Sequence, residues 1–132
     1  MSARRIDSKV LGVLSDTHGS YPAWVSAVSL FKNADAVLHA GDVLYHGPRN
    51  PIPGGYTPAD LADAINRYKG TIFIARGNCD ADVDQMVLAP LLAPYVSIWW
   101  NGKKILMMHG DNFPLFRQMA LDSAVHLAIS GH

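Results

Sequence analysis

Short apolar runs alternate with helix-like segments over the first two thirds of the chain. The runs cover residues 10–14, 36–40 and 71–75, and apolar residues dominate each of them without alternation, which is typical of strands buried on both faces. Between them, apolar residues recur at helical spacing after Ser20 and after Thr57, and a proline follows each of these capping residues within the first turn. The pattern predicts parallel strands joined by helices.

The pattern changes in the last third. A short helix is expected over residues 82–89, and two strands at 95–100 and 103–108 flank Asn101-Gly102, a favoured hairpin turn. A helix over 115–124 and a strand over 125–130 follow. Because no linker or repeat separates the two halves, we expect a single domain over residues 1–132, in which the hairpin begins a second sheet packed on the first. The predicted fold class is a layered α/β sandwich.

Composition narrows the classes of function. The chain has 132 residues, 49% of them hydrophobic, and its 11 basic and 11 acidic residues are scattered, so no basic stripe indicates extended nucleic-acid binding. No apolar run approaches the roughly 18 residues that span a membrane, and no cleavage site of a signal peptide follows Arg4-Arg5. The single cysteine, Cys79, excludes an intrachain disulfide. A cytoplasmic, soluble protein is expected.

Polar motifs follow directly after the strand-like runs, and they contain the residue types that bind divalent cations. Taken singly, each motif is more often structural, since a loop aspartate commonly caps a helix and a lone histidine is rarely a ligand. Together, at consecutive strand ends, they favour a metal site at one sheet edge. The motifs are Asp16-Thr17-His18-Gly19, Gly41-Asp42, Gly77-Asn78-Cys79-Asp80, His109-Gly110 and Gly131-His132.

The spacing of these residues suits two metals. Asp16 and His18 are two positions apart, so both side chains can reach one cation. Asp42 follows a glycine that allows a sharp turn, and one carboxylate can bridge two metals. Asn78 offers a neutral oxygen that limits negative charge near an anionic substrate. His109 and His132 would complete the second metal's ligands with imidazoles.

This series of motifs resembles the calcineurin-like metallophosphoesterases, whose pattern is D-x-H, G-D, G-N-H-[DE], H and G-H-x-H. The segments 41–50, 77–80 and 83–86 are similar to the small bacterial YfcE-type phosphodiesterases within that superfamily. The resemblance implies a four-layer αββα fold, manganese or a similar divalent ion (Zn2+, Fe2+, Ni2+ or Mg2+), and hydrolysis of a small phosphodiester by a hydroxide bridging two metals.

The resemblance also implies residue roles. The first metal would be held by Asp16, His18 and Asp42, and the second by Asp42, Asn78, His109 and His132, with Asp42 as the bridge. It places the catalytic centre at Asp42, Asn78, Cys79 and His109.

Two departures from the family pattern change the expectations. Cys79 stands where most of the superfamily has a histidine that assists the leaving group. A thiol is a poor general acid, so Cys79→Ala should change the rate little. The G-H-x-H motif stops at His132, so we expect a C-terminally incomplete domain that lacks the last strands of its second sheet. A weakened first metal and association of copies through the open edge would follow.

The loop over residues 44–56 is rich in glycine and proline and lies next to the predicted site. Its His46 and Arg49 are candidates for contact with the substrate phosphate, and a solvated loop or a dimer contact is the alternative. His39, inside an apolar run, is predicted to be a hydrogen-bonded core histidine. Two alternatives to catalysis stay open: a protein-interaction scaffold of the same fold, resembling a retromer subunit, and an inactive fragment.

Overall fold

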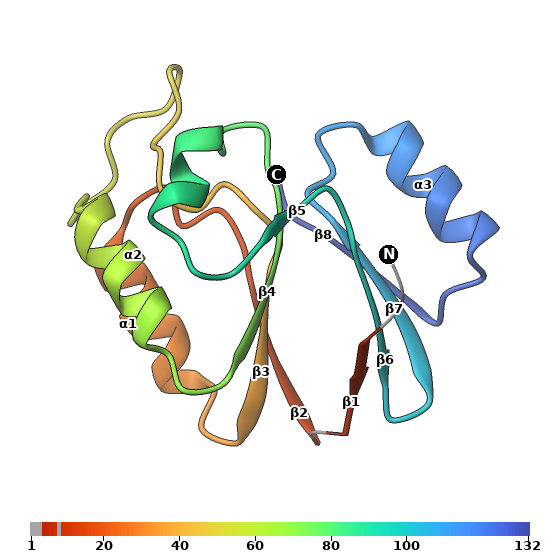
Figure 1. The fold of residues 1–132 in the computed structure, drawn as a ribbon. Coiled ribbons are helices and arrows are strands. Elements are labelled where there is room, and N and C mark those ends of the chain that lie inside the picture. Colours follow the sequence, from red (N-terminus) through yellow and green to blue (C-terminus); the bar gives the residue numbers. More distant parts are fainter. Residues whose placement is uncertain (1–3, 8) are drawn as a thin grey trace.

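Two facing sheets with helices on their outer sides form the molecule, a computed structural model that describes residues 4–7 and 9–132 (Figure 1). All strands of the first sheet are parallel, in the order β2-β3-β4-β5. Two helices, α1 and α2, cover its outer face (Figure 1). The bounds are β2 Val10–Leu14, α1 Tyr21–Leu30, β3 Ala34–His39, α2 Pro58–Arg67, β4 Thr71–Ala75 and β5 Leu92–Ala93.

The second sheet has the order β1-β6-β7-β8 and mixes strand directions. The Asn101-Gly102 turn joins β6 and β7 as an antiparallel pair, whereas β1 pairs parallel with β6, and β8 parallel with β7. Figure 1 shows α3 on the outer side of this sheet, which completes the predicted α, β, β, α layers. The bounds are β1 Arg4–Ile6, β6 Val96–Trp100, β7 Lys103–Met108, α3 Phe113–Asp122 and β8 Leu127–Ser130.

Neighbouring residues of β3 belong to two different cores. Val37 packs with Leu61 and Ile65 of α2, whereas Leu38 packs with Ile98 of β6 and other residues between the sheets. Because both faces of its central part are covered, Ala36, Val37 and Leu38 form a continuous apolar run instead of an alternating one. This explains why the apolar runs predicted the first sheet well.

Several predicted elements need correction. Strands β1 and β5 were not predicted, because β1 is a short, charged segment and β5 has only two residues. The short helix expected over 82–89 is a 3₁₀ helix, η1 (Asp82–Met86), which ends earlier than expected. The helix expected over 115–124 begins earlier, since the Asn112 side chain accepts a hydrogen bond from Leu115 N (3.2 Å) and caps it. Strand β8 is shorter than expected, and β3 lies at 34–39 instead of 36–40.

The described residues include no helix long and apolar enough to cross a membrane.

Candidate metal centre

The loops that follow β2 and β3 are held together by backbone hydrogen bonds. Asp16 N donates to Gly41 O (2.9 Å), and His18 N donates to Asp42 O (3.0 Å). Asp16, His18 and Asp42 have φ angles of 56°, 46° and 59°, a region that costs a residue with a Cβ atom free energy. His132 has a φ of 71° as well. Unfavourable backbone conformations thus gather at the predicted ligands.

Asp42 lies at the centre of this site and is 2% exposed. Its Oδ1 accepts a hydrogen bond from Cys79 N (2.8 Å), and its Oδ2 lies 3.1 Å from His109 Nε2 and 3.8 Å from His18 Nε2. Burial raises the pKa of Asp42, but the nearby His109 imidazole and the hydrogen bond from Cys79 N outweigh burial and hold this pKa below its ordinary value. The carboxylate is therefore ionised and available to cations.

Both imidazoles nearest Asp42 are oriented in the same way. Nδ1 of His109 donates to Ala40 O (2.6 Å), and Nδ1 of His18 donates to Tyr45 O (2.8 Å), since a carbonyl oxygen can only accept. Each ring therefore directs Nε2 towards Asp42. A backbone carbonyl on the far nitrogen is the usual partner of a metal-binding histidine.

The Nε2 atom of His109 is buried and makes no hydrogen bond, although Asp42 Oδ2 lies 3.1 Å away. Burial lowers the pKa of His109, but the Asp42 carboxylate and the Ala40 carbonyl outweigh burial and raise this pKa to about 9. A buried nitrogen without a hydrogen-bond partner beside an ionised carboxylate is an arrangement that a cation would satisfy. A cation there would displace the proton of Nε2.

Two groups of ligand atoms, each within 4.8 Å of one another, share Asp42. One group contains Asp42, His109 and His132, and the other contains Asp42, His18 and Cys79. A carboxylate common to both groups is what a bridging ligand requires. The carboxylates and imidazoles present are ligands that Mn2+, Zn2+ and Fe2+ accept, so the residues fit a divalent metal centre.

Asp16 joins this centre through its two oxygens. Its Oδ1 lies 3.4 Å from His18 Nε2, and its Oδ2 accepts hydrogen bonds from the Ser15 hydroxyl and from His132 N (2.9 Å). The His132 ring lies 5.1 Å from the His109 ring, between centroids. Ligand candidates from both sheets therefore meet at one place.

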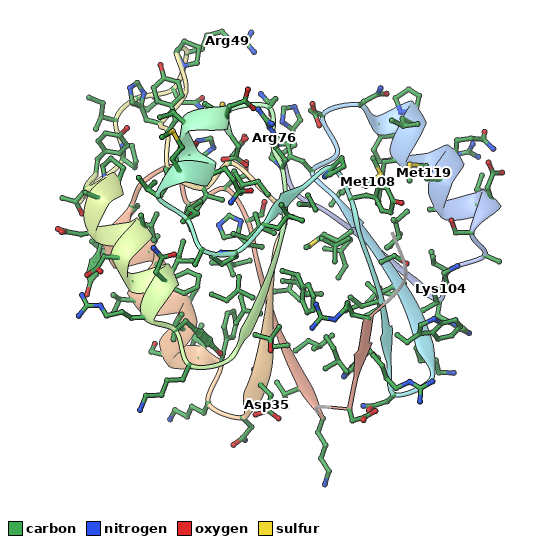
Figure 2. The ribbon with its side chains drawn as sticks, viewed as in Figure 1. Asp35, Arg49, Arg76, Lys104, Met108 and Met119 are labelled. Atoms are coloured by element: carbon green, nitrogen blue, oxygen red, sulfur yellow. The ribbon has the colours of Figure 1, made fainter. Side chains whose placement is uncertain are left out.

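A cavity of about 620 Å³ opens onto this cluster. It is lined by all predicted metal ligands except the buried His109, and also by Cys79 and Arg49. Figure 2 shows Arg49 at the outer end of the loop between β3 and α2. The ring of His46 instead packs on Tyr45 (4.6 Å between centroids) and Tyr56 (5.4 Å), and His46 does not line this cavity. The substrate contacts of His46 and Arg49 stay predictions.

Asp80 has a role that the sequence analysis missed. Its buried carboxylate accepts hydrogen bonds from three backbone N–H groups: Asp42 N (2.9 Å), Val43 N (2.8 Å) and Gly77 N (2.7 Å). It thereby ties the loop after β4 to the loop after β3. Burial raises the pKa of Asp80 in spite of these bonds. In the sequence, only its position in the Gly77-Asn78-Cys79-Asp80 motif indicated that Asp80 belongs to the site.

His39 is hydrogen-bonded and completely buried, as predicted. Gly41 N donates to its Nδ1 (3.1 Å), so Nε2 carries the hydrogen and donates to Thr17 Oγ1 (3.0 Å). Thr17 in turn donates to Val43 O (2.9 Å). Burial lowers the pKa of His39 to about 4. The neutral ring links the two loops that carry Asp16, His18 and Asp42.

Comparison with known proteins extends these observations. Residues 10–131 match the family described as calcineurin-like phosphoesterase. Phosphodiesterase YfcE of Escherichia coli (strain K12) is 39% identical over 112 residues, which cover 79% of this chain and 61% of that protein. The chain thus spans about 61% of the length of this curated relative.

Solved structures show the same likeness. A structure of YfcE, a phosphoesterase from E. coli, superposes with a TM-score of 0.73 at 38% identity, covering 77% of this chain and 58% of that one. An archaeal phosphodiesterase has a TM-score of 0.70 at 18% identity, covering 92% of this chain and 72% of that one. Vacuolar protein sorting 29 from Cryptosporidium parvum has a TM-score of 0.65 at 15% sequence identity, covering 96% of this chain and 66% of that one. The last two likenesses show the fold alone.

Proposed function

Because this chain belongs to the calcineurin-like phosphoesterase family, we propose that it is a metal-dependent phosphodiesterase acting on a small phosphodiester. The observation that carries the proposal is the position of Asp42. Its ionised carboxylate is shared by two groups of ligand atoms and faces the unpartnered Nε2 of His109. The 39% identity to phosphodiesterase YfcE supports the reaction class.

The chain would hold two divalent metals, of which Mn2+ is the expected ion. Asp16, His18 and Asp42 would bind one, and Asp42, Asn78, His109 and His132 would bind the other. When bound, such ions neutralise phosphate charge and supply a hydroxide nucleophile at neutral pH. Asn78 is exposed beside Asp42 on the cavity wall, where its neutral amide adds no negative charge.

The residues around the metals position the ligands and limit acid catalysis. Cys79 N–H holds Asp42 Oδ1, and the carbonyls of Ala40 and Tyr45 orient the two imidazoles. Burial, and then the carboxylates of Asp42 and Asp80, raise the pKa of the Cys79 thiol. A thiol of this kind protonates a leaving group poorly, so the proposed enzyme favours substrates whose leaving group needs no proton.

The experiment is Mn2+-dependent hydrolysis of bis(4-nitrophenyl) phosphate by this chain and by Asp42→Asn, with metal binding measured by calorimetry. Asp60→Asn, an exposed carboxylate on α2, is the matched control. We expect turnover in the unchanged chain and in Asp60→Asn, and loss of both turnover and tight binding in Asp42→Asn.

Two other outcomes would reject the proposal. Metal binding without turnover would favour the interaction scaffold. Neither binding nor turnover in the unchanged chain would favour an inactive fragment.

A further inference from the structure

A second cavity, of about 480 Å³, lies beside the metal centre. It runs between α2 and η1, which Figure 1 shows on the same side of the molecule as the loop after β3. We call it the α2 groove and define it by the residues that form its apolar surface. They are Tyr45, Tyr56, Ala59, Ala62, Val83 and Val87.

The amide and carboxylate side chains at the α2 groove already have partners. Asn66 donates from Nδ2 to Val87 O (2.8 Å) and accepts at Oδ1 from Ala89 N (2.8 Å). Asp84 accepts a hydrogen bond from Ala81 N (3.1 Å), and Asp63 pairs with Arg67. None of the described residues that line the groove is a lysine, an arginine or a histidine. The groove therefore suits an uncharged apolar group and does not suit a phosphate.

The α2 groove and the metal cavity share their walls. Tyr45 lines both, and its backbone carbonyl is held by Nδ1 of His18 (2.8 Å), a predicted metal ligand. Asp80 and Ala81 line the metal cavity, and Val83, two residues further along the chain, lines the groove. A molecule whose phosphate sits at the metal centre can thus extend an attached group past Tyr45.

Large apolar side chains of the groove are exposed to solvent. Val83 is 61% exposed, Val87 53% and Tyr45 41%. Covering such side chains with an apolar group stabilises a complex by about 25 cal/mol for each Å² removed from water. The groove can therefore add affinity that the polar metal cavity does not supply.

We propose that the α2 groove binds an apolar alcohol group of the phosphodiester substrate, aromatic or aliphatic, while the phosphate occupies the metal cavity. The inference rests on the proposed function, and it narrows the substrate to diesters that carry at least one uncharged apolar substituent. Tyr45, at the junction, is the residue that contacts both parts of such a substrate.

The test compares the binding of diphenyl phosphate and dimethyl phosphate, measured by calorimetry on the Mn2+-loaded chain, so that no turnover is needed. We expect diphenyl phosphate to bind about ten-fold or more tightly than dimethyl phosphate, since its phenyl groups are the larger apolar substituents. Equal affinities would overturn the proposal.

Variants of groove residues test whether the preference for diphenyl phosphate arises in the α2 groove. Val83→Asn and Ala59→Trp, one making the groove polar and the other filling it, should each abolish the preference and leave dimethyl phosphate binding unchanged. Met86→Asn is the matched control, because Met86 lies on the same short helix, is 83% exposed and does not line the groove. A preference that survives in both groove variants would place the apolar group elsewhere and overturn the proposal.

Two further results separate this inference from the proposed function. A preference for diphenyl phosphate that depends on the groove, without hydrolysis of any diester, would support the groove as a binding site and reject the enzyme. If sedimentation showed that Val83→Asn dissociates a dimer and the preference were absent, the groove would be a contact between copies of this chain.

Discussion

At the scale of single residues, the metal centre depends on side chains that are not themselves ligands. His39 and Asp80 each connect loops from different strands, Asp80 through backbone N–H groups and His39 through Gly41 N and the Thr17 hydroxyl. Asp80 contacts the backbone of Asp42, and His39 reaches Thr17 between Asp16 and His18. Such contacts fix ligand positions before a metal binds.

The buried His39 predicts acid sensitivity. Its pKa is about 4 in the folded chain and about 6.5 in an unfolded chain, so the unfolded state takes up the proton first as the pH falls. The contribution of His39 to stability should therefore be complete above pH 6.5 and be lost progressively towards pH 4, by about 3 kcal/mol in total. Urea unfolding of the metal-free chain at several pH values measures this change.

His39→Gln is the comparison for that series, because glutamine does not titrate. The difference in unfolding free energy between the two proteins should shrink as the pH falls from 6.5 to 4. A difference that stays constant, or an NMR titration of the His39 ring with a midpoint near 6.5, would contradict the prediction.

Gly77 predicts a steric effect on the metal centre. A Cβ atom at this position would lie 2.2 Å from Asp42 Oδ1 and 2.5 Å from Asp42 N, so Asp42 must move in Gly77→Ala. We expect the affinity for Mn2+ to fall by about ten-fold or more, with helix and strand content retained. Calorimetry and circular dichroism measure the two quantities.

Gly54→Ala is the matched control, since a Cβ atom there would meet nothing within 4 Å. Unchanged Mn2+ affinity in Gly77→Ala would show that Asp42 is not a ligand in the position described.

At the scale of elements, β3 is the strand on which both cores depend. It pairs with β2 on one side and β4 on the other, Val37 packs in the core under the helices, and Leu38 packs in the core between the sheets. Its last residue, His39, directly precedes the loop that carries Asp42. Packing in β3 and geometry at the metal centre are therefore linked along the chain.

Leu38 has no solvent exposure, so Leu38→Ala leaves a cavity between the sheets. We expect a loss of about 2–5 kcal/mol in the free energy of unfolding, measured in urea. Leu30→Ala, where the side chain is 80% exposed at the end of α1, should change the value by less than about 0.5 kcal/mol. Similar losses in both variants would contradict a core between the sheets.

At the scale of the whole molecule, one edge of the second sheet and the helix α3 expose apolar surface. Among the described strands, β8 ends this sheet, and apolar side chains on β8 and α3 are exposed. Edge strands and apolar patches favour association with another chain. The exposed fractions are Phe113 55%, Leu115 46%, Leu121 60% and Leu127 45%.

We expect concentration-dependent association of copies through this surface, measured by sedimentation velocity. A lysine on an edge strand opposes pairing, so Leu127→Lys should shift the distribution towards monomer. Leu30→Lys, at the end of α1 on the outer side of the first sheet, should leave the distribution between monomer and associated chains unchanged. A monomer at all concentrations in the unchanged chain would show that this surface does not mediate association.

The sequence by itself determined the strands that can be recognised from a short stretch of neighbouring residues. The runs at 10–14, 71–75 and 103–108 coincide with β2, β4 and β7, because a short apolar run and a hairpin turn can both be recognised from adjacent residues. The polar motifs at the strand ends also predicted that Asp16, His18, Asp42, His109 and His132 lie close together, and the structure brings these five residues together; their roles as ligands stay predictions.

Only the tertiary structure decided features that join distant segments. Strand β1 forms because β6, far along the chain, offers its edge, and nothing in the segment Arg4–Ile6 predicts that pairing. The roles of Asp80 and His39, and the α2 groove, likewise depend on which backbone groups and side chains meet after packing. A local pattern encodes periodicity and turns, whereas hydrogen-bond partners and cavities arise from contacts that short stretches of sequence do not contain.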